Sequence, residues 1–363
     1  MRAWRFYGFG DLRLDDVAEP VCRPGHVIVE PLCVQPSVTE AQLAFGIRTL
    51  AYDKIKHRLE TEAPVQLFGH EFSARIIEVG DGVTGFVAGD RVAARAKLPC
   101  GDCSLCRSER SHLCRRGPII GFQLPGCFSE RAILPEIALV KLDERISDSE
   151  GACLQSLSDS VAAVETADIA LGDSIVVLGQ GSMGLECMQI ARLSGAGQVI
   201  TVDVRDEACQ ASRELGADHA LNAAKLDPIA AIRDLTGGNG ADIVFECAGG
   251  SPKQGLAGHK TVMQAVDAAR SGGKIIGVSW FGQPLELDID TLRERSLRYL
   301  FPDISTRGHL EHTVHLVASG RVRLKETITH VLDGLESVPQ AFEITAHKGR
   351  YKAINPAQVV IRR

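Results

Sequence analysis

Four cysteines lie close together in the first third of this 363-residue chain, and their spacing is typical of a metal site. Four thiolates in so short a segment suit a closed tetrahedral zinc site, which has no open coordination position and is therefore structural. A redox relay and an iron–sulfur centre are the alternatives. The other seven of the eleven cysteines are scattered, which favours reduced thiols over disulfides. The predicted ligands are Cys100, Cys103, Cys106 and Cys114.

A glycine-rich segment of the form G-x-G-x-x-G follows an apolar run and precedes a helical pattern. Its first glycine permits a tight turn, its second lets the backbone approach a pyrophosphate, and its third lets the helix pack against the strand. The segment therefore predicts a dinucleotide site. The expected cofactor-binding residues are Gly179, Gly181, Ser182, Met183 and Gly184.

Asp203 ends the next strand pattern, nineteen residues after Gly184, which is close to the spacing of such dinucleotide sites. Its carboxylate would accept hydrogen bonds from both ribose hydroxyls and repel a 2′-phosphate, so we expect NAD(H). Arg205 is near enough to accommodate that phosphate, and NADP(H) therefore stays an alternative. Arg205 is otherwise a charged loop residue or one that stacks on adenine.

The elements that must position these residues follow two patterns. Up to about residue 150 the chain is rich in Gly, Pro and short β-type runs, such as 27–29 and 74–79. Between residues 173 and 278 apolar runs alternate with helical stretches, which predicts a doubly wound parallel α/β sheet. The runs are 174–178, 198–202, 241–247 and 274–278; the helical stretches include 185–194 and 206–215. After residue 298 we expect helices at 309–319 and 340–347 and a strand at 358–361.

Composition excludes several functional classes. The length suggests two domains, and 45% hydrophobic with 24% charged residues is typical of a globular protein. The net charge of −6, without basic blocks, argues against nucleic-acid and polybasic membrane partners. No apolar run is long enough for a spanning helix or a signal core. We therefore expect a cytoplasmic protein that acts on a small-molecule substrate.

The motifs, in this order, resemble the medium-chain dehydrogenase/reductase superfamily, in particular its zinc alcohol, polyol and threonine dehydrogenases. Residues 68–72 resemble the G-H-E box of that family, 89–92 its G-D-R-V turn, and 244–249 and 272–277 its late coenzyme strands. The resemblance covers nearly the whole chain and implies a GroES-like catalytic domain with an inserted Rossmann domain. We expect the first over 1–157 and 299–363, with the structural zinc lobe at 97–116, and the second over 158–298.

The chain departs from this family at the second, catalytic zinc. In the family the ligands are a Cys in a C-G-[ST]-D-x-H stretch, the His of the G-H-E box, and a Glu or Cys before a P-L-type stretch. Here Gln35 and Gln155 replace the first and third ligands, and only His70 remains. Two neutral amides supply no charge to hold a divalent cation, so we expect one structural zinc and no catalytic zinc.

Two alternatives would restore a metal beside His70. A shift of two residues in this alignment would give ligation by Cys33, His70 and Cys153, and thus a conventional zinc alcohol dehydrogenase. Recruitment of a metal by Glu40 or Glu71 together with His70 is the second alternative.

The remaining polar residues predict hydride transfer with proton handling by the protein. Ser37 keeps a hydroxyl where the family contacts the reacting oxygen, and His70 is the candidate acid or base. Glu71 would orient His70, while Gln35 and Gln155 would bind a polar substrate. We expect an NAD(H)-dependent enzyme that interconverts a hydroxyl and a carbonyl on a small polar substrate, in a specialised pathway. Reduction of an activated C=C bond, as in plant alkaloid reductases that lack this zinc, is one alternative; a nicotinamide-binding sensor without turnover is another.

Two further expectations concern surfaces. The stretch 48–58 is basic and would bind an anionic or large substrate, or simply form a solvated helix face, which we favour. Relatives pair the edge strands of their Rossmann domains, and residues 296–301 occupy the corresponding region. The resemblance therefore implies a homodimer or homotetramer.

Overall fold

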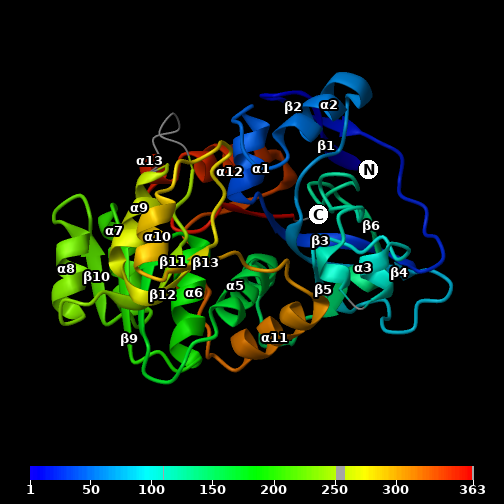
Figure 1. Ribbon diagram of the computed structural model, residues 1–363. Helices are drawn as coiled ribbons and strands as arrows, with labels where there is room; N and C mark the ends of the chain where they lie inside the picture. Colours follow the sequence, from blue (N-terminus) through cyan, green and yellow to red (C-terminus); the bar gives the residue numbers. More distant parts are fainter. Residues whose placement is uncertain (109, 251–257, 362–363) are drawn as a thin grey trace. The chain divides into compact units, whose positions relative to one another are not determined.

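The computed structural model describes residues 1–108, 110–250 and 258–361 of the chain (Figure 1). Parts of the predicted zinc lobe, of the predicted second domain and of the C-terminus thus lie outside the described residues. The chain divides into two compact units. The first comprises Met1–Ser158, Ile304–Gly320 and Ile328–Arg363, and the second comprises Asp159–Asp303 and Arg321–Thr327.

The first unit is built on a seven-stranded sheet with the order β14-β15-β3-β4-β5-β7, in which β6 also pairs with β3. Most neighbours are antiparallel, and β1 and β2 form a separate antiparallel pair. The expected strands at 27–29 and 74–79 are parts of the longer β3 and β4. The strands are β1 (Arg2–Gly8), β2 (Asp11–Asp16), β3 (His26–Gln35), β4 (Glu71–Val79), β5 (Arg91–Ala94), β6 (Ala132–Pro135), β7 (Leu139–Lys141), β14 (Val331–Asp333) and β15 (Gln358–Val360).

Short helices cover this sheet, and four buried aromatic rings pack together in the core beneath them. The ring centroids of Phe6, Phe68, Phe128 and Phe342 lie 4.9–6.0 Å apart in edge-on or tilted pairs, the arrangement that aromatic quadrupoles favour. The helices are α1 (Val38–Ala44), α2 (Tyr52–Glu62), α3 (Ser104–Arg107), α4 (Asp148–Ala152), α11 (Arg307–Ala318), α12 (Val338–Ala346) and α13 (Lys348–Tyr351), with single 3-10 turns at Ser111–Leu113, Glu136–Ala138 and Leu335–Ser337. Helix α5 (Leu154–Ala167) begins in this unit and continues into the second unit from Asp159.

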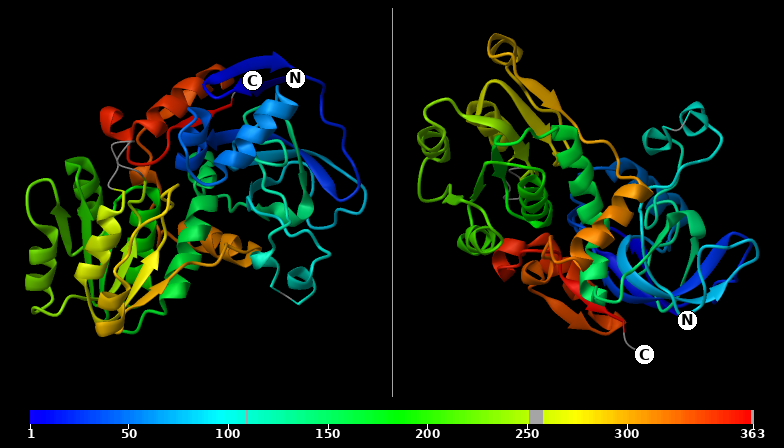
Figure 2. Two further views of the ribbon diagram at one scale, coloured as in Figure 1. Left: turned by 45° about the horizontal axis from the view of Figure 1, so that its top comes forward. Right: turned by 90° about the horizontal axis from the view of Figure 1, so that it is seen from below.

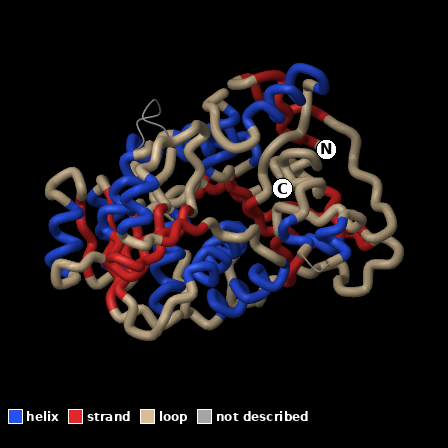
Figure 3. Tube along the Cα trace, viewed as in Figure 1, coloured by secondary structure: helices blue, strands red, loops and turns tan. Residues whose placement is uncertain are grey.

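The second unit contains the predicted doubly wound parallel sheet, with the strand order β10-β9-β8-β11-β12-β13. The chain passes from β8 through β9 to the edge strand β10 and then returns to β11 beside β8. Because crossover connections are right-handed, this return places helices on both faces of the sheet, as Figures 2 and 3 show. The strands are β8 (Ser174–Leu178), β9 (Gln198–Asp203), β10 (His219–Asn222), β11 (Ala241–Glu246), β12 (Ala269–Gly277) and β13 (Arg298–Leu300). The helices are α6 (Ser182–Leu193), α7 (Asp206–Glu214), α8 (Pro228–Leu235), α9 (Lys260–Ala268) and α10 (Ile289–Glu294), with a 3-10 turn at Lys325–Thr327.

The observed units differ from the expected ranges near the C-terminal half of the chain. The first unit resumes at Ile304 rather than at residue 299, because β13 completes the six-stranded sheet. The segment Arg321–Thr327 belongs to the second unit, because the backbone of Arg323 exchanges two hydrogen bonds with the Gln189 side chain, at 2.9 and 3.2 Å. In the described part of the chain, each helix is too short or too polar to cross a bilayer.

Candidate functional site

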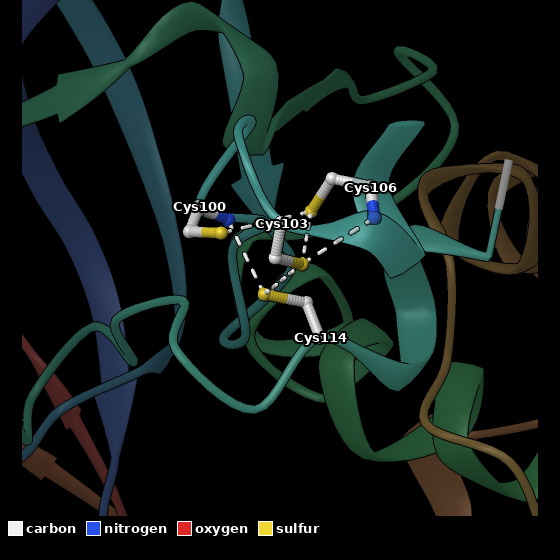
Figure 4. A group of neighbouring side chains, drawn as sticks. All are labelled: Cys100, Cys103, Cys106 and Cys114. Atoms are coloured by element: carbon white, nitrogen blue, oxygen red, sulfur yellow. Dashed lines mark hydrogen bonds between the residues drawn. The ribbon is translucent and has the colours of Figure 1, made fainter. Parts of the chain in front are cut away.

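The four clustered cysteines converge on one point in the first unit (Figure 4). The Sγ atoms of Cys103 and Cys106 lie 3.5 Å apart, and other pairs lie 3.8 and 3.9 Å apart. Four Zn–S bonds of about 2.3 Å would place the sulfur atoms of a tetrahedral site about 3.8 Å apart. The donor set and its dimensions therefore fit a structural zinc ion.

Backbone amides around this cluster favour thiolates. The amide of Cys106 donates to Cys103 Sγ at 3.4 Å and lowers the pKa of that thiol. The amide of Cys100 donates to Cys114 Sγ at 3.4 Å and lowers the pKa of that thiol to about 6. The carboxylate of Asp102 instead raises the pKa of Cys100 to about 11, so this residue needs the charge of a metal ion to ligate as a thiolate.

The glycine-rich loop joins β8 to α6 in the second unit, and each of its three glycines has a different role. Gly179 has φ +88°, and a Cβ there would lie 2.7 Å from the backbone of Ala248. A Cβ at Gly184 would collide with the carbonyl oxygen of Gly179, so helix and strand pack closely there. A Cβ at Gly181 would have no neighbour within 4 Å, and this residue caps α6. An open approach to a helix N-terminus fits a pyrophosphate group.

Asp203, at the end of β9, holds this loop. Its Oδ2 accepts from the backbone amide of Gln180 at 2.7 Å, and its Oδ1 accepts from the backbone amide of Arg205 at 2.9 Å. Arg205 Nε also donates to Oδ1, at 3.3 Å. A carboxylate has about four acceptor positions, so about one remains for a ribose hydroxyl. The buried side chain of Gln180 donates to Val177 O and Gly179 O and accepts from Ser212, which fixes the turn. The sequence motif leaves this position as "x", so the role of Gln180 was missed.

The predicted catalytic residues of the first unit meet where β3 ends and β4 begins. Gln35 and Glu71 are register partners across these strands, and Gln35 Nε2 donates to Glu71 Oε2 at 2.5 Å. Glu71 Oε1 lies 3.9 Å from His70 Nε2. All three side chains are buried. The structure thus brings together Gln35, His70 and Glu71.

The turn before β4 fixes the position of His70. Phe68 and Gly69 both have positive φ, at 67° and 85°. Gly69 cannot be replaced easily, because a Cβ there would lie 2.9 Å from the Phe128 ring. Bulky residues such as Phe68 rarely adopt a positive φ. The backbone amide of Phe68 donates to Gly121 O at 2.6 Å, and this hydrogen bond helps to hold the Phe68 ring in the core.

Glu40 also has a role that the sequence motifs do not predict. It was considered only as a metal recruiter, but it is fully buried and lies with Oε1 2.6 Å from His70 Nδ1. The same oxygen accepts from the Gly69 amide at 2.9 Å, and Oε2 accepts from the Ser37 amide at 3.0 Å. The missed signal is the S-x-x-E spacing of a helix capping box, in which the hydroxyl of Ser37 accepts from the Glu40 amide at 3.1 Å.

Cys33 and Cys153 are buried, and among the described residues they form no group of potential metal ligands with His70. Cys33 is paired with Ser73, two register positions before the Gln35–Glu71 pair, and burial raises its thiol pKa to about 12. Cys153 Sγ lies 3.5 Å from Gln35 Oε1. Among the described residues, the only group of three or more potential His, Cys, Asp or Glu metal ligands within 4.8 Å of one another is the four-cysteine cluster.

Gln155 lies at the start of α5 and is buried, two residues after Cys153. Its carbonyl oxygen accepts from the Ser158 hydroxyl at 2.6 Å. The contact between Cys153 and Gln35 brings the beginning of α5 to the same end of β3.

The basic stretch at 48–58 comprises the segment before α2 and the first part of that helix, and acidic residues of α2 pair with its basic side chains. Arg48 binds Asp53 at 2.9 Å, and Arg58 binds Glu62 at 2.6 Å. Lys56 lies 3.6 Å from Glu60. This pairing agrees with a solvated helix face.

Comparison with known proteins identifies both parts of the chain. Residues 40–144 match the family described as the alcohol dehydrogenase GroES-like domain. Residues 182–317 match the family described as zinc-binding dehydrogenase.

Individual relatives cover most of the chain. L-threonine 3-dehydrogenase of Pyrococcus horikoshii is 27% identical over 93% of this chain and 92% of its own length. Sorbitol dehydrogenase 1 of Saccharomyces cerevisiae is 32% identical over 79% of this chain and 80% of its own length. The solved structure of alcohol dehydrogenase TADH from Thermus sp. ATN1 has a TM-score of 0.82 and 25% identity, with 100% of both chains covered.

Proposed function

This chain belongs to the zinc-type medium-chain dehydrogenase/reductase superfamily of NAD(P)-dependent enzymes, and we propose that it interconverts a hydroxyl and a carbonyl group on a small polar substrate with NAD(H). The observation that carries the proposal is the position of His70 between the carboxylates of Glu40 and Glu71. An imidazole between two carboxylates is a strong candidate for proton transfer.

The second unit supplies the cofactor site in this proposal. A bound nicotinamide ring would supply or accept the hydride. Gly181 and the N-terminus of α6 would hold the pyrophosphate, with Ser182 and Met183 beside it, and Asp203 would bind the ribose hydroxyls. The carboxylate of Asp203 favours NAD(H), whereas Arg205 lies 3.3 Å from Asp203 and is placed to soften that preference.

We propose further that the family's catalytic zinc is not held beside His70. Zinc sites use thiolate, imidazole and carboxylate ligands, whereas the corresponding residues here are Gln35, His70 and Gln155. The amide of Gln35 is also engaged with Glu71, and both nitrogens of His70 face carboxylates. This donor set does not fit a zinc ion, so no step of the mechanism uses one.

His70 is the proposed acid and base, and Nε2 is the atom that exchanges the proton. Two backbone amides donate to Glu40, which fixes the position of that carboxylate beside the imidazole. In the proposed tautomer the hydrogen lies on His70 Nδ1, which is 2.6 Å from Glu40 Oε1. Nε2 then gains or loses the proton of the reacting oxygen. The hydrogen of the Ser37 hydroxyl is not used by the helix cap and is available to donate to a carbonyl oxygen.

Reduction of an activated C=C bond is the second candidate, because an unsaturated carbonyl needs only a hydride and a weak proton donor. A protonated His70 between two carboxylates is such a donor. A nicotinamide-binding sensor and a zinc enzyme that uses Cys33, His70 and Cys153 are the remaining alternatives.

One set of measurements separates these candidates. Zinc per chain, measured by elemental mass spectrometry without added metal, is expected to be one; two would favour the zinc enzyme. L-threonine and D-sorbitol with NAD⁺, and cyclohexanone and 2-cyclohexenone with NADH, are the activity probes. Turnover of the alcohols or the ketone supports the proposal, whereas turnover of the enone alone favours C=C reduction. NADH binding without any turnover would favour the sensor.

We also propose a homo-oligomer assembled through β13. This strand is at the edge of the six-stranded sheet, and Phe301, directly after it, has 71% of its surface exposed. An open edge strand beside an exposed aromatic ring is a typical pairing surface. Light scattering tests the proposal, and a monomer would contradict it.

A further inference from the structure

A buried glutamine outside the predicted site contacts Gln35, one of its members. Gln358 begins β15 and is fully buried in the first unit. Its Nε2 donates to Gln35 Oε1 and to the carbonyl oxygen of Ser149, both at 2.9 Å, and lies 3.3 Å from Cys153 Sγ. Its Oε1 accepts from the thiol of Cys33 at 3.4 Å. The amide thus connects β3, the α4 segment and β15.

The direction of these hydrogen bonds is determined by a backbone group. The carbonyl oxygen of Ser149 accepts only, so the NH₂ group of Gln358 must face it. The same NH₂ group then faces Gln35, which must present its oxygen. The NH₂ group of Gln35 is therefore turned toward Glu71, where it donates at 2.5 Å. The opposite orientation of Gln35 would place two NH₂ groups against each other and an amide oxygen against a carboxylate.

The orientation of the Gln35 amide also affects the surroundings of His70. The NH₂ group of Gln35 donates to Glu71 Oε2, while Oε1 of the same carboxylate lies 3.9 Å from His70 Nε2. Gln35 therefore fixes which oxygen of Glu71 faces the imidazole. The two sides of the imidazole are then anchored independently. Glu40 is anchored by backbone amides on one side, and Glu71 is anchored by the series Ser149, Gln358 and Gln35 on the other.

We propose that Gln358 is a positioning residue for the reaction, because it sets the direction of the Gln35 amide and through it presents Glu71 to His70. This inference rests on the proposed function of His70 as the proton-transfer group. It assigns a role in the chemistry to a residue on β15, which is more than 280 positions from His70 in the chain.

A double-mutant cycle tests this role. Gln35→Leu and Gln358→Leu are made singly and together, and kcat and KM are measured with whichever of L-threonine, D-sorbitol, cyclohexanone and 2-cyclohexenone the wild type turns over fastest. Each single variant should lower kcat roughly tenfold with little change in KM, which is less than the roughly hundredfold loss that a 1 Å misplacement can cause. The double variant should lose about tenfold rather than a hundredfold, because Gln358 acts only through Gln35.

Two controls separate positioning from packing. Thr345→Val removes the hydrogen bond that the Ala357 amide, next to Gln358, makes at 3.0 Å, and should leave kcat unchanged. Gln358→Glu keeps the size of the side chain but alters its donor pattern, and it replaces the leucine variant if that variant does not fold.

The outcomes are distinct. Coupled losses in kcat with an unaffected Thr345→Val variant support the positioning role. Additive losses, or a kcat that follows the thermal midpoint across all variants including Thr345→Val, would overturn it while leaving the proposed function intact. A wild type inactive toward all four probes would overturn the proposed function and, with it, this role for Gln358.

Discussion

The four-cysteine cluster and the His70 site are two polar centres of the same unit, and they are built in opposite ways. The cluster draws all its ligands from residues 100–114, and their sulfur atoms have the dimensions of a zinc site. The His70 site draws on α1, β3, β4 and β15, and hydrogen bonds between side chains join its members. A local site depends on the metal, whereas a dispersed site depends on the fold. We therefore expect substitutions at the His70 site to leave the zinc content unchanged, and substitutions in the cluster to leave the proton-transfer group in place.

The largest expected effect is loss of the metal from the cluster. Cys103→Ser removes one of four thiolates, so zinc per chain should fall from about one to near zero. A loss of about 2 kcal/mol would lower the Tm by roughly 2–3 °C in a protein of this size. Elemental mass spectrometry and calorimetry check both values. Cys22→Ser, outside the cluster, is the matched control, and full zinc content in Cys103→Ser would contradict the assignment.

The next effect should appear in catalysis without a change in metal content. His70→Gln removes the group that exchanges the proton, and kcat should fall roughly 10²- to 10⁴-fold. Zinc per chain and NADH binding should stay at wild-type values. His57→Gln on the exposed face of α2 serves as the control. A variant of His70 that retained wild-type kcat would remove the basis for the proposed acid–base role.

A smaller effect is expected at the cofactor loop. Asp203→Ser removes the negative charge that repels a 2′-phosphate, and the lost charge-assisted hydrogen bonds should cost about 1.5–3 kcal/mol of NADH affinity. The ratio of kcat/KM for NADH over NADPH should therefore fall, while the zinc content stays constant. Asp206→Ser, on the exposed side of α7, is the control. An unchanged ratio would mean that Asp203 serves only to hold the loop.

The smallest effect concerns the buried thiol of Cys33 on β3. Burial raises the pKa of Cys33 to about 12, against an ordinary value of 9.0, so the folded state binds a proton that the unfolded state releases between these values. The stability from this group is complete below pH 9 and is lost as pH rises toward 12, with a slope of at most about 1.4 kcal/mol per pH unit. Unfolding of wild type and Cys33→Val at pH 8 and pH 10.5 measures the difference. The wild type should lose more stability than the variant, and equal losses would show that Cys33 is not held as the thiol.

Much of the architecture could be predicted because periodic patterns report it directly. The run 174–178 coincides with β8, and the helical stretch 206–215 differs from α7 only by its last residue. These elements are recognisable from local alternation of apolar residues and from turn glycines. The boundary at Arg321–Thr327 was not predictable in this way, because its membership of the second unit depends on Gln189, more than 130 positions earlier.

The amino-acid sequence by itself determined the chemistry available to this protein: four soft ligands in one short loop, a glycine turn followed by an acid at the right distance, and two amides where a metal would need charged donors. These features are local, so spacing alone reveals them. Only the tertiary structure decided that Glu40 is placed against His70 and that Gln358 orients Gln35. The S-x-x-E spacing predicts only the cap that Ser37 and Glu40 form on α1. The contacts of Glu40 with His70 and of Gln358 with Gln35 act over about 3 Å between distant parts of the chain, so sequence spacing does not encode them.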